Sequence, residues 1–232
     1  MVLPPLNFNF ENMSLLDLIE PTIPVLKPGD TVDDALRMMS DAHFDRLPLI
    51  DKGVYVSIIK EAALLDWEEP DTALAKLPYE IIRPACIVTA HPFDAVKVAL
   101  QFKLPMVPVL NERQEYLGCV SRDALFYYLG ESGSLSEQGG IIVLEIKPQD
   151  YVLSQIAKIA ENEDVKILNS RVYLNPKTEM LEVTLKMSKV ELQRVVSALE
   201  RYDYHVKEIY GDIPAQDDLD DRYKLLMNYL NI

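Results

Sequence analysis

The residues best suited to acid–base chemistry lie close together at His43, Asp45 and Arg46. An imidazole beside a carboxylate can act as a general base when a nucleophile or a substrate lies within reach. The sequence places no nucleophile near this group, and it contains no phosphate-binding glycine loop and no GxSxG, HExxH or GxGxxG motif. The pattern therefore predicts a protein that is not an enzyme, with this polar group at a helix-to-strand turn.

The two cysteines, Cys86 and Cys119, each lie inside an apolar stretch, and no histidine is adjacent in sequence. This favours buried free thiols over a metal site, and it favours the cytoplasm, where thiols stay reduced. The chain has 232 residues and a formal net charge of −14. Such a charge repels a phosphate backbone, and no apolar run is long enough to span a bilayer. Neither nucleic acid nor a membrane is therefore an expected partner.

Two apolar stretches, RLPLID and MVPVLN, each carry a proline inside what otherwise resembles a strand. Pro48 and Pro108 are separated by the same 60 positions as Ala35 and Ala95. In both copies a short extended segment precedes a helix with apolar residues at helical spacing, and a hairpin and a second helix follow. The sequence therefore predicts two β-α-β-β-α units in tandem.

The last third of the chain has a different pattern. A Gly/Ser-rich stretch over residues 131–140 predicts a linker. The segments that follow predict the order β-α-β-β-α-β of a ferredoxin-like fold, with an Asp150 cap before the first helix. Ser188 and Glu191 have the spacing of a capping box and predict the start of the second helix there.

The duplicated unit resembles the CBS domain, which occurs in tandem pairs. The resemblance is carried by PVLKPGDTVDDAL and RLPLID, and by their counterparts IVTAHPFDAV and MVPVLN. A ferredoxin-like unit behind such a pair resembles the CBS–ACT proteins, including the acetoin-utilisation type. The resemblance implies an α+β fold with a tandem CBS pair and an ACT-like domain. The expected domains are a first CBS repeat at 12–69, a second at 70–130, a linker at 131–140, an ACT-like domain at 141–211, and an acidic linker with an amphipathic helix at 212–232.

In CBS pairs that bind nucleotides, the last strand of a repeat usually runs Gly-h-h-Thr/Ser-x-x-Asp, where h is apolar. The second repeat matches this pattern at Gly118 and Ser121 but has Ala124 at the aspartate position. The first repeat has Lys60 at the hydroxyl position and Ala63 at the aspartate position. Ser121 is expected either to contact a phosphate or ribose or to cap a helix, and Lys60 either to contact a phosphate or to be solvated.

The resemblance also implies an apolar slot between the repeats that could hold an adenine ring, although its wall residues could equally be plain core. The candidate ligand-binding residues are Val25, Leu47, Lys60, Ile87, Met106, Val107 and Ser121. No catalytic residue, metal or obligatory cofactor is expected, and an adenine nucleotide is the candidate ligand. In the ACT-like domain the loop from Lys147 to Tyr151 lacks the usual glycine, so a dimer-forming role is favoured over amino-acid binding.

Three functions are open at this point. The expected one is a regulatory module that senses a small metabolite in the cleft of the CBS pair. The alternative is a degenerate CBS–ACT scaffold that acts through homo-oligomerisation and protein contacts, and the third is an enzyme of unrecognised type. A homodimer is expected through apolar helix residues at Leu64, Leu65, Phe126 and Tyr127. The C-terminal helix, with apolar residues Leu219, Tyr223, Leu226 and Leu230, could pack on the chain itself or contact a protein partner.

Overall fold

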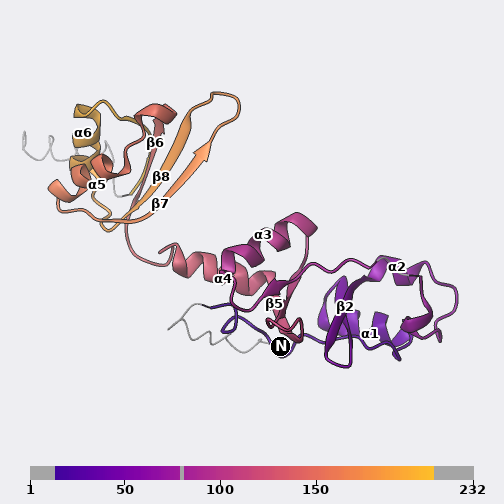
Figure 1. Cartoon of the computed structure of the whole chain (residues 1–232). Coiled ribbons are helices and arrows are strands. Elements are labelled where there is room, and N and C mark those ends of the chain that lie inside the picture. The colour runs from indigo at the N-terminus through magenta and orange to yellow at the C-terminus, as the bar shows by residue number, and fades with distance from the viewer. Residues whose placement is uncertain (1–13, 79–80, 212–232) are drawn as a thin grey trace, which may run out of the picture. The chain divides into compact units, whose positions relative to one another are not determined.

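The computed structural model describes residues 14–78 and 81–211, and it divides the chain into two compact units, residues 1–129 and 130–232 (Figure 1). The predicted amphipathic helix over 212–232 and the first two residues of the predicted first repeat lie outside the described residues. Across the described ranges, no helix has the length and apolar character needed to cross a membrane.

The first unit repeats one order of elements, as the sequence predicted. The opening strand of the second repeat is β3, and its counterpart in the first is a single parallel bridge between Leu26 and Leu49. The elements of the first repeat are α1 (Val32–Ala42), β1 (Arg46–Asp51), β2 (Val54–Lys60) and α2 (Glu61–Leu65). Those of the second are β3 (Cys86–Ile87), α3 (Pro92–Phe102), β4 (Met106–Leu110), β5 (Tyr116–Ser121) and α4 (Arg122–Ser132).

The long helices of the two repeats begin and end in similar ways. Helix α1 opens with a capping box in which the Thr31 hydroxyl accepts from the Asp34 N–H, while the Asp34 carboxylate accepts from the Thr31 N–H. Helix α3 opens with Pro92 after His91, whose Nδ1 accepts a backbone N–H. Both helices end at a residue in the left-handed region, His43 with φ 57° and Lys103 with φ 52°. His43 therefore lies at the helix-to-strand turn that the sequence indicated.

The hydrophobic cores of the two repeats are shared. Met106 and Cys119 of the second repeat are buried in one cluster with Leu47 and other residues of the first. Ile58 of the first repeat is in turn buried among residues of the second. Because each repeat contributes apolar side chains to the core of the other, the two repeats pack as one body rather than as two separate domains.

The described part of the second unit has the predicted order β-α-β-β-α-β. Its antiparallel sheet has the strand order β7-β8-β6-β9, and both helices cover one face of it (Figure 1). The buried core lies between that face and the helices. The elements are β6 (Ile141–Ile146), α5 (Leu153–Asn162), β7 (Ile167–Leu174), β8 (Leu181–Met187), α6 (Gln193–Arg201) and β9 (His205–Tyr210).

Both predicted helix caps in this unit were wrong. Asp150 lies in a short 3₁₀ turn, and α5 begins three residues after it, where Val152 occupies the cap position without a side-chain bond. Helix α6 begins at Gln193 rather than after Ser188. The Ser188 hydroxyl accepts instead from the Lys166 N–H at 2.9 Å, so it joins two chain segments.

One buried hydroxyl in this unit is a source of instability. The Ser170 Oγ is buried and has no hydrogen-bond partner among the described residues. Ser170 pairs with Leu185 of β8, so its side chain faces the apolar core. We expect Ser170→Ala to raise the free energy of unfolding by about 1 kcal/mol, because it removes an unpaired polar group. Urea denaturation checks this, with the exposed Ser136→Ala as a control that is expected to change little.

Candidate functional site

The two hairpins of the first unit meet along a seam. Val54 at the start of β2 bridges Glu115, and the Tyr116 N–H donates to the Gly53 carbonyl at 3.0 Å. Tyr55 occupies the middle of this seam and is fully buried. A small apolar cluster surrounds it, made of Ile50, Tyr55 and Leu110 with Val25, Ala85, Ile87 and Tyr116 packed against them. The seam is therefore closed by side chains from both repeats at its centre.

The predicted wall residues occupy two kinds of position. Leu47, Met106 and Val107 have no exposed surface and belong to the shared cores. Val25 and Ile87 are partly exposed and pack on the seam cluster. In this arrangement Leu47 and Met106 lie in one buried cluster, and of the five predicted wall residues only Val25 and Ile87 are partly exposed.

Ser121 lies at the end of β5 and is almost completely buried. Its Oγ accepts the N–H of Ala124 at 3.0 Å, which caps α4. The same hydroxyl donates to the Glu20 carboxylate, and the Glu20 N–H donates to the Cys119 carbonyl at 2.9 Å. Ser121 is thus the helix cap that the sequence offered as one alternative, and it also holds the segment before α1 against β5.

Basic side chains gather around Asp45 where β1 begins. Arg46 forms a two-pronged pair with Asp45, with nitrogen–oxygen distances of 3.0 and 2.7 Å. This pair, with a smaller contribution from Arg122 of the second repeat, holds the pKa of Asp45 below its usual value. Lys60 pairs with Arg46 across the hairpin, and both Lys60 and Arg122 are exposed. Arg46 and, more weakly, Arg122 thus act on the Asp45 carboxylate, and Lys60 lies across the hairpin from Arg46, in a chain that is strongly acidic overall.

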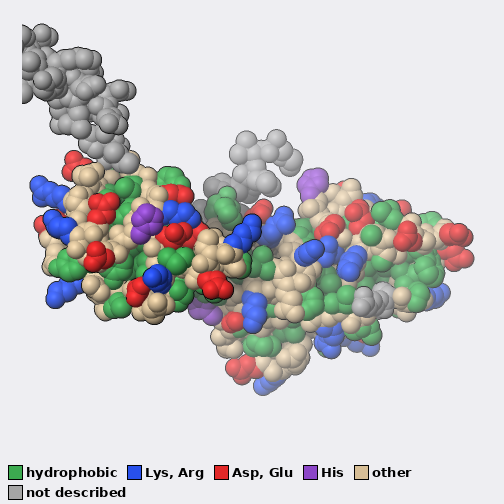
Figure 2. Space-filling model, turned by 90° about the horizontal axis from the view of Figure 1, so that it is seen from above, with side chains coloured by type: hydrophobic (Ala, Val, Ile, Leu, Met, Phe, Trp, Pro, Cys, Tyr) green, Lys and Arg blue, Asp and Glu red, His purple; other side chains and the backbone are tan. Residues whose placement is uncertain are grey.

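The surface in general is mixed in charge. The face drawn in Figure 2 carries acidic and basic side chains interspersed among hydrophobic ones. Among the described residues, no group of three or more His, Cys, Asp or Glu side chains is arranged to hold a metal ion. The cations around Asp45 are therefore the feature of the first unit best suited to an anionic ligand group.

The two thiols are poor nucleophiles. Burial raises the pKa of Cys119 to about 12, and the nearby Glu20 carboxylate adds to this effect. Burial also raises the pKa of Cys86 to about 11. The Tyr116 hydroxyl donates to the Cys119 Sγ at 3.3 Å, and burial raises the pKa of this phenol as well. These groups stay protonated at neutral pH, which is consistent with buried free thiols.

Glu20 and Arg122 are site residues that the sequence did not single out. Glu20 lies in the segment before α1, and only its pairing with β5 brings it to Ser121. Arg122 directly follows Ser121, so its position in the sequence was known, but its electrostatic effect on Asp45 acts between the repeats and follows from the fold. The one sequence signal for this site was the charged pair at residues 45 and 46, which lies where β1 of the first hairpin begins.

A hollow of about 270 Å³ lies at the other end of the first hairpin. Val25, Pro28 and Ile50 provide its apolar lining, and its charged lining residues are Lys27, Asp51 and Lys52. Of the predicted ligand-binding residues, Val25 lines this hollow. A small ligand with an apolar body and an anionic group fits this combination of side chains.

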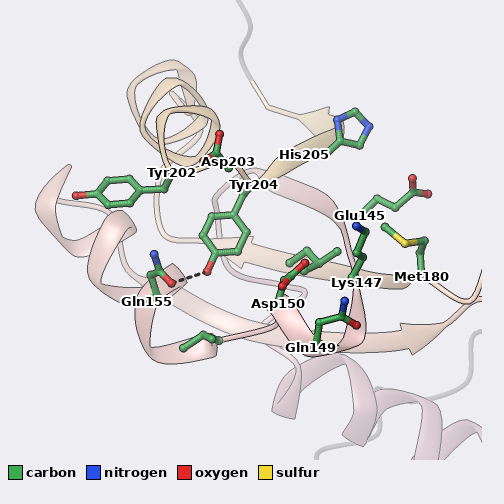
Figure 3. A pocket seen from close by; sticks show the side chains of 12 residues that line it. Glu145, Lys147, Gln149, Asp150, Gln155, Met180, Tyr202, Asp203, Tyr204 and His205 are labelled. Carbon is green, nitrogen blue, oxygen red and sulfur yellow. Dashed lines mark hydrogen bonds between the residues drawn. The ribbon is translucent and has the colours of Figure 1, made fainter.

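A larger hollow of about 540 Å³ lies in the second unit, between the loop after β6 and the turn before β9 (Figure 3). The Tyr204 hydroxyl donates to the Gln155 side-chain oxygen at 3.2 Å within it. Burial and the nearby Asp150 raise the pKa of Tyr204. Acidic residues outnumber basic ones in the lining, which consists of Glu145, Ile146, Lys147, Gln149, Asp150, Val152, Gln155, Met180, Tyr202, Asp203, Tyr204 and His205. The excess of negative charge in this lining favours a cationic ligand group, so the hollow does not favour a ligand that carries a carboxylate.

The first repeat matches a known family. A family model covers residues 16–69, from the segment that carries Glu20 through β1 and β2 to the residues after α2. The match is to the CBS domain. The resemblance inferred for the first CBS repeat is therefore confirmed, and the structure gives the second repeat the same order of elements. No curated protein matches the chain.

Several solved structures contain CBS domains with a similar arrangement. A CBS domain pair/ACT domain protein from Thermotoga maritima is 19% identical over 51% of this chain and 98% of its own, with a TM-score of 0.47. The CBS domains of a transcriptional regulator from Streptococcus pneumoniae are 22% identical over 50% of this chain and 99% of their own, with a TM-score of 0.45. CBSX2 in complex with AMP, a protein from Arabidopsis thaliana, is 19% identical over 52% and 98%, with a TM-score of 0.44.

Proposed function

We propose that the first unit is a non-catalytic regulatory module that binds a small metabolite between its two repeats, with an adenine nucleotide as the candidate ligand. The observation that carries the proposal is the cluster of cations around Asp45. Arg46 and Lys60 come from the first repeat and Arg122 from the second, so an anionic ligand there contacts both repeats at once. Ligand binding then stabilises one arrangement of the repeats, which is what a sensor requires.

Each residue of this cluster has a distinct part in the proposal. Arg122 and Lys60 are exposed and can reach a phosphate, whereas Arg46 is held in place by Asp45. Glu20 supplies a carboxylate beside Ser121, and a carboxylate can accept several hydroxyl donors at once. Glu20 can thereby accept a ribose hydroxyl in place of the aspartate that the sequence replaces with Ala124.

A thermal-shift screen tests the proposal. Purified protein is heated with AMP, ADP, ATP, NADH, S-adenosylmethionine and a set of amino acids. A ligand at 100 times its dissociation constant adds about 2.7 kcal/mol of stability, which is a readable shift. We expect a nucleotide to shift the transition and Arg122→Glu to abolish that shift, because the substitution replaces an attracting charge with a repelling one. Glutamate suits the first turn of α4, so the variant is expected to fold.

The matched control is Arg113→Glu, which makes the same charge change in the turn between β4 and β5. It is expected to leave the nucleotide shift unchanged apart from a weak effect of net charge. Equal losses in the two variants would indicate a general electrostatic effect rather than a site. No shift with any nucleotide would contradict the nucleotide proposal, and a shift with an amino acid alone would move the ligand site to the second unit.

A scaffold role is the second candidate, and exposed apolar side chains support it. Leu65, Phe126 and Tyr127 are between about half and three-quarters exposed on α2 and α4. Leu64 does not belong to this surface, because it is buried in the core of the first repeat. A second copy that covered these three side chains would make a homodimer through the first unit. A ligand screen without a hit would favour this scaffold role over the sensor role.

A further inference from the structure

The segment before α1, residues 14–20, packs on the second repeat, although the family match counts residues from 16 onward as part of the first. Leu15 and Leu18 have exposed fractions of 0% and 1%, and they lie in a buried cluster that consists mainly of second-repeat residues. The chain pairs with the first repeat only after this segment, where Leu26 bridges Leu49 of β1. Residues 14–20 therefore form a strap that closes the core of the second repeat.

Few polar contacts hold the strap in place. Among the described residues, one isolated bridge joins it to β5, in which the Glu20 N–H donates to the Cys119 carbonyl at 2.9 Å. The Glu20 carboxylate also accepts from the Ser121 hydroxyl. Within the strap the backbone forms turns rather than a helix, and the Leu18 N–H donates to the Leu15 carbonyl at 3.2 Å. A segment held by so few backbone bonds opens at a lower cost than the core strands.

The connection between the repeats is tied to the first hairpin more firmly than the strap is tied to the second. Ser57 of β2 exchanges two hydrogen bonds of 3.2 Å with the backbone of Ile82, and the Ile58 N–H donates to the Ile82 carbonyl at 3.2 Å. The position that corresponds to Ser57 in the second repeat is Gly118, where a methyl group would collide with the Ile19 side chain of the strap. Apolar packing therefore replaces side-chain hydrogen bonds at this point of the strap.

We propose that the strap opens while both repeats stay folded, and that a ligand at the cations around Asp45 holds it closed. The second part rests on the proposed function, in which Glu20 accepts a ribose hydroxyl. The Glu20 carboxylate then joins Ser121 to the ligand, so ligand binding adds a contact that favours the closed strap. Because coupling between two equilibria is reciprocal, a closed strap also tightens the ligand by the same factor. The position of the strap is thus the output of the sensor.

The two native cysteines report on the opening of the strap in the full chain. Cys86 is buried in the same cluster as Leu15 and Leu18, whereas Cys119 is buried in the core of the first repeat. Release of the strap uncovers only the first of these clusters, while unfolding of the whole unit exposes both thiols together. Labelling with a disulfide reagent, resolved by peptide mass spectrometry, is therefore expected to be about tenfold faster at Cys86 than at Cys119. Equal rates at the two thiols would overturn the proposal.

A substitution in the strap separates its opening from unfolding of the unit. Leu18→Ala removes an apolar anchor and is expected to raise the labelling rate of Cys86 about tenfold while that of Cys119 stays unchanged. Leu104→Ala is the matched control, because Leu104 is buried in the same cluster but lies just before β4. The control is expected to raise both rates by one common factor, through unfolding of the unit. The same parallel rise in Leu18→Ala would show that the strap is an inseparable part of the core, contrary to the proposal.

Amide hydrogen exchange tests the coupling to the ligand, because it follows the strap itself rather than a thiol that a ligand could shield. AMP, ADP and ATP are each added to the full chain. A nucleotide that raises the melting temperature is expected to slow exchange over residues 14–20 about tenfold, and Leu18→Ala is expected to weaken its binding severalfold. A nucleotide that binds but leaves this exchange unchanged would overturn the coupling and spare the sensor. If none of the three binds, the sensor and the coupling both fail, and the labelling of the ligand-free chain alone decides whether the strap opens.

Discussion

Replacing Gly139 with alanine is expected to lower the folding stability of the second unit by about 3 kcal/mol or more. Gly139 has a φ of 152°, which side-chain-bearing residues rarely adopt. A methyl group there would lie 1.8 Å from the Met187 carbonyl oxygen, a backbone atom that cannot rotate away. At the next residue, the Gly140 carbonyl accepts the Met187 N–H and the Gly140 N–H donates to the Lys189 carbonyl, each at 2.9 Å, so relief of the clash would break the end of the β6–β8 ladder.

Urea denaturation followed by circular dichroism measures this effect. Gly130→Ala is the matched control, because the space around Gly130 is open and the residue lies inside α4. Alanine favours a helix over glycine by up to about 1 kcal/mol, so this variant is expected to be neutral or slightly stabilised. A loss of less than about 1 kcal/mol in Gly139→Ala would show that the start of β6 can shift, contrary to the packing described.

Gly139 also shows a limit of predicting local structure from amino-acid composition. A Gly/Ser-rich stretch predicts flexibility, and residues 131–140 were interpreted as a linker on that ground. At its end, however, glycine is required by a close approach between two backbone segments that are almost 50 residues apart. The same limit explains the wrong capping box. Ser188 and Glu191 have a suitable spacing, but the Ser188 hydroxyl accepts from the distant Lys166 N–H instead.

The repeat, by contrast, was predictable because its signals are local and duplicated. The prolines at 48 and 108 were placed correctly in strands, and for Pro48 the structure gives the reason that it is tolerated. The Pro48 carbonyl accepts the Leu26 N–H at 2.8 Å, so the backbone of Pro48 faces the opening segment of the repeat. That segment forms a single bridge, at Leu26, and residue 24, two positions earlier, is not paired in a ladder. The N–H that Pro48 lacks would therefore have no partner among the described residues of this segment.

The candidate site was predictable only in part, because its decisive contacts join segments distant in sequence. Apolar residues near the strand starts were expected to line a slot, yet Leu47, Met106 and Val107 face the shared core. Alternation along a strand tells which residues share a face, but it does not tell whether that face meets a ligand or another repeat. The contact of Glu20 with Ser121 spans about 100 positions and follows from tertiary packing alone.

Tyr55→Ala is expected to destabilise the first unit by about 4 kcal/mol, because it removes the largest side chain at the centre of the seam. Tyr55 is fully buried, and its hydroxyl donates to the Pro84 carbonyl at 3.3 Å. The Arg83 guanidinium lies 5.9 Å from the ring centroid and donates to the Tyr55 carbonyl at 2.7 Å. Truncation therefore leaves a cavity between the repeats and removes the aromatic partner of Arg83.

Tyr55→Phe separates the ring from its hydroxyl. It keeps the volume and removes only the bond to Pro84, so a cost of about 1 kcal/mol is expected in the same denaturation experiment. If the two variants lost equal stability, the hydroxyl rather than the packing would hold the seam. If neither lost stability, the repeats would not depend on this cluster. A large loss confined to Tyr55→Ala would establish that packing at the seam, rather than the hydroxyl, joins the two repeats, and a single transition shared by both repeats would show that they unfold together.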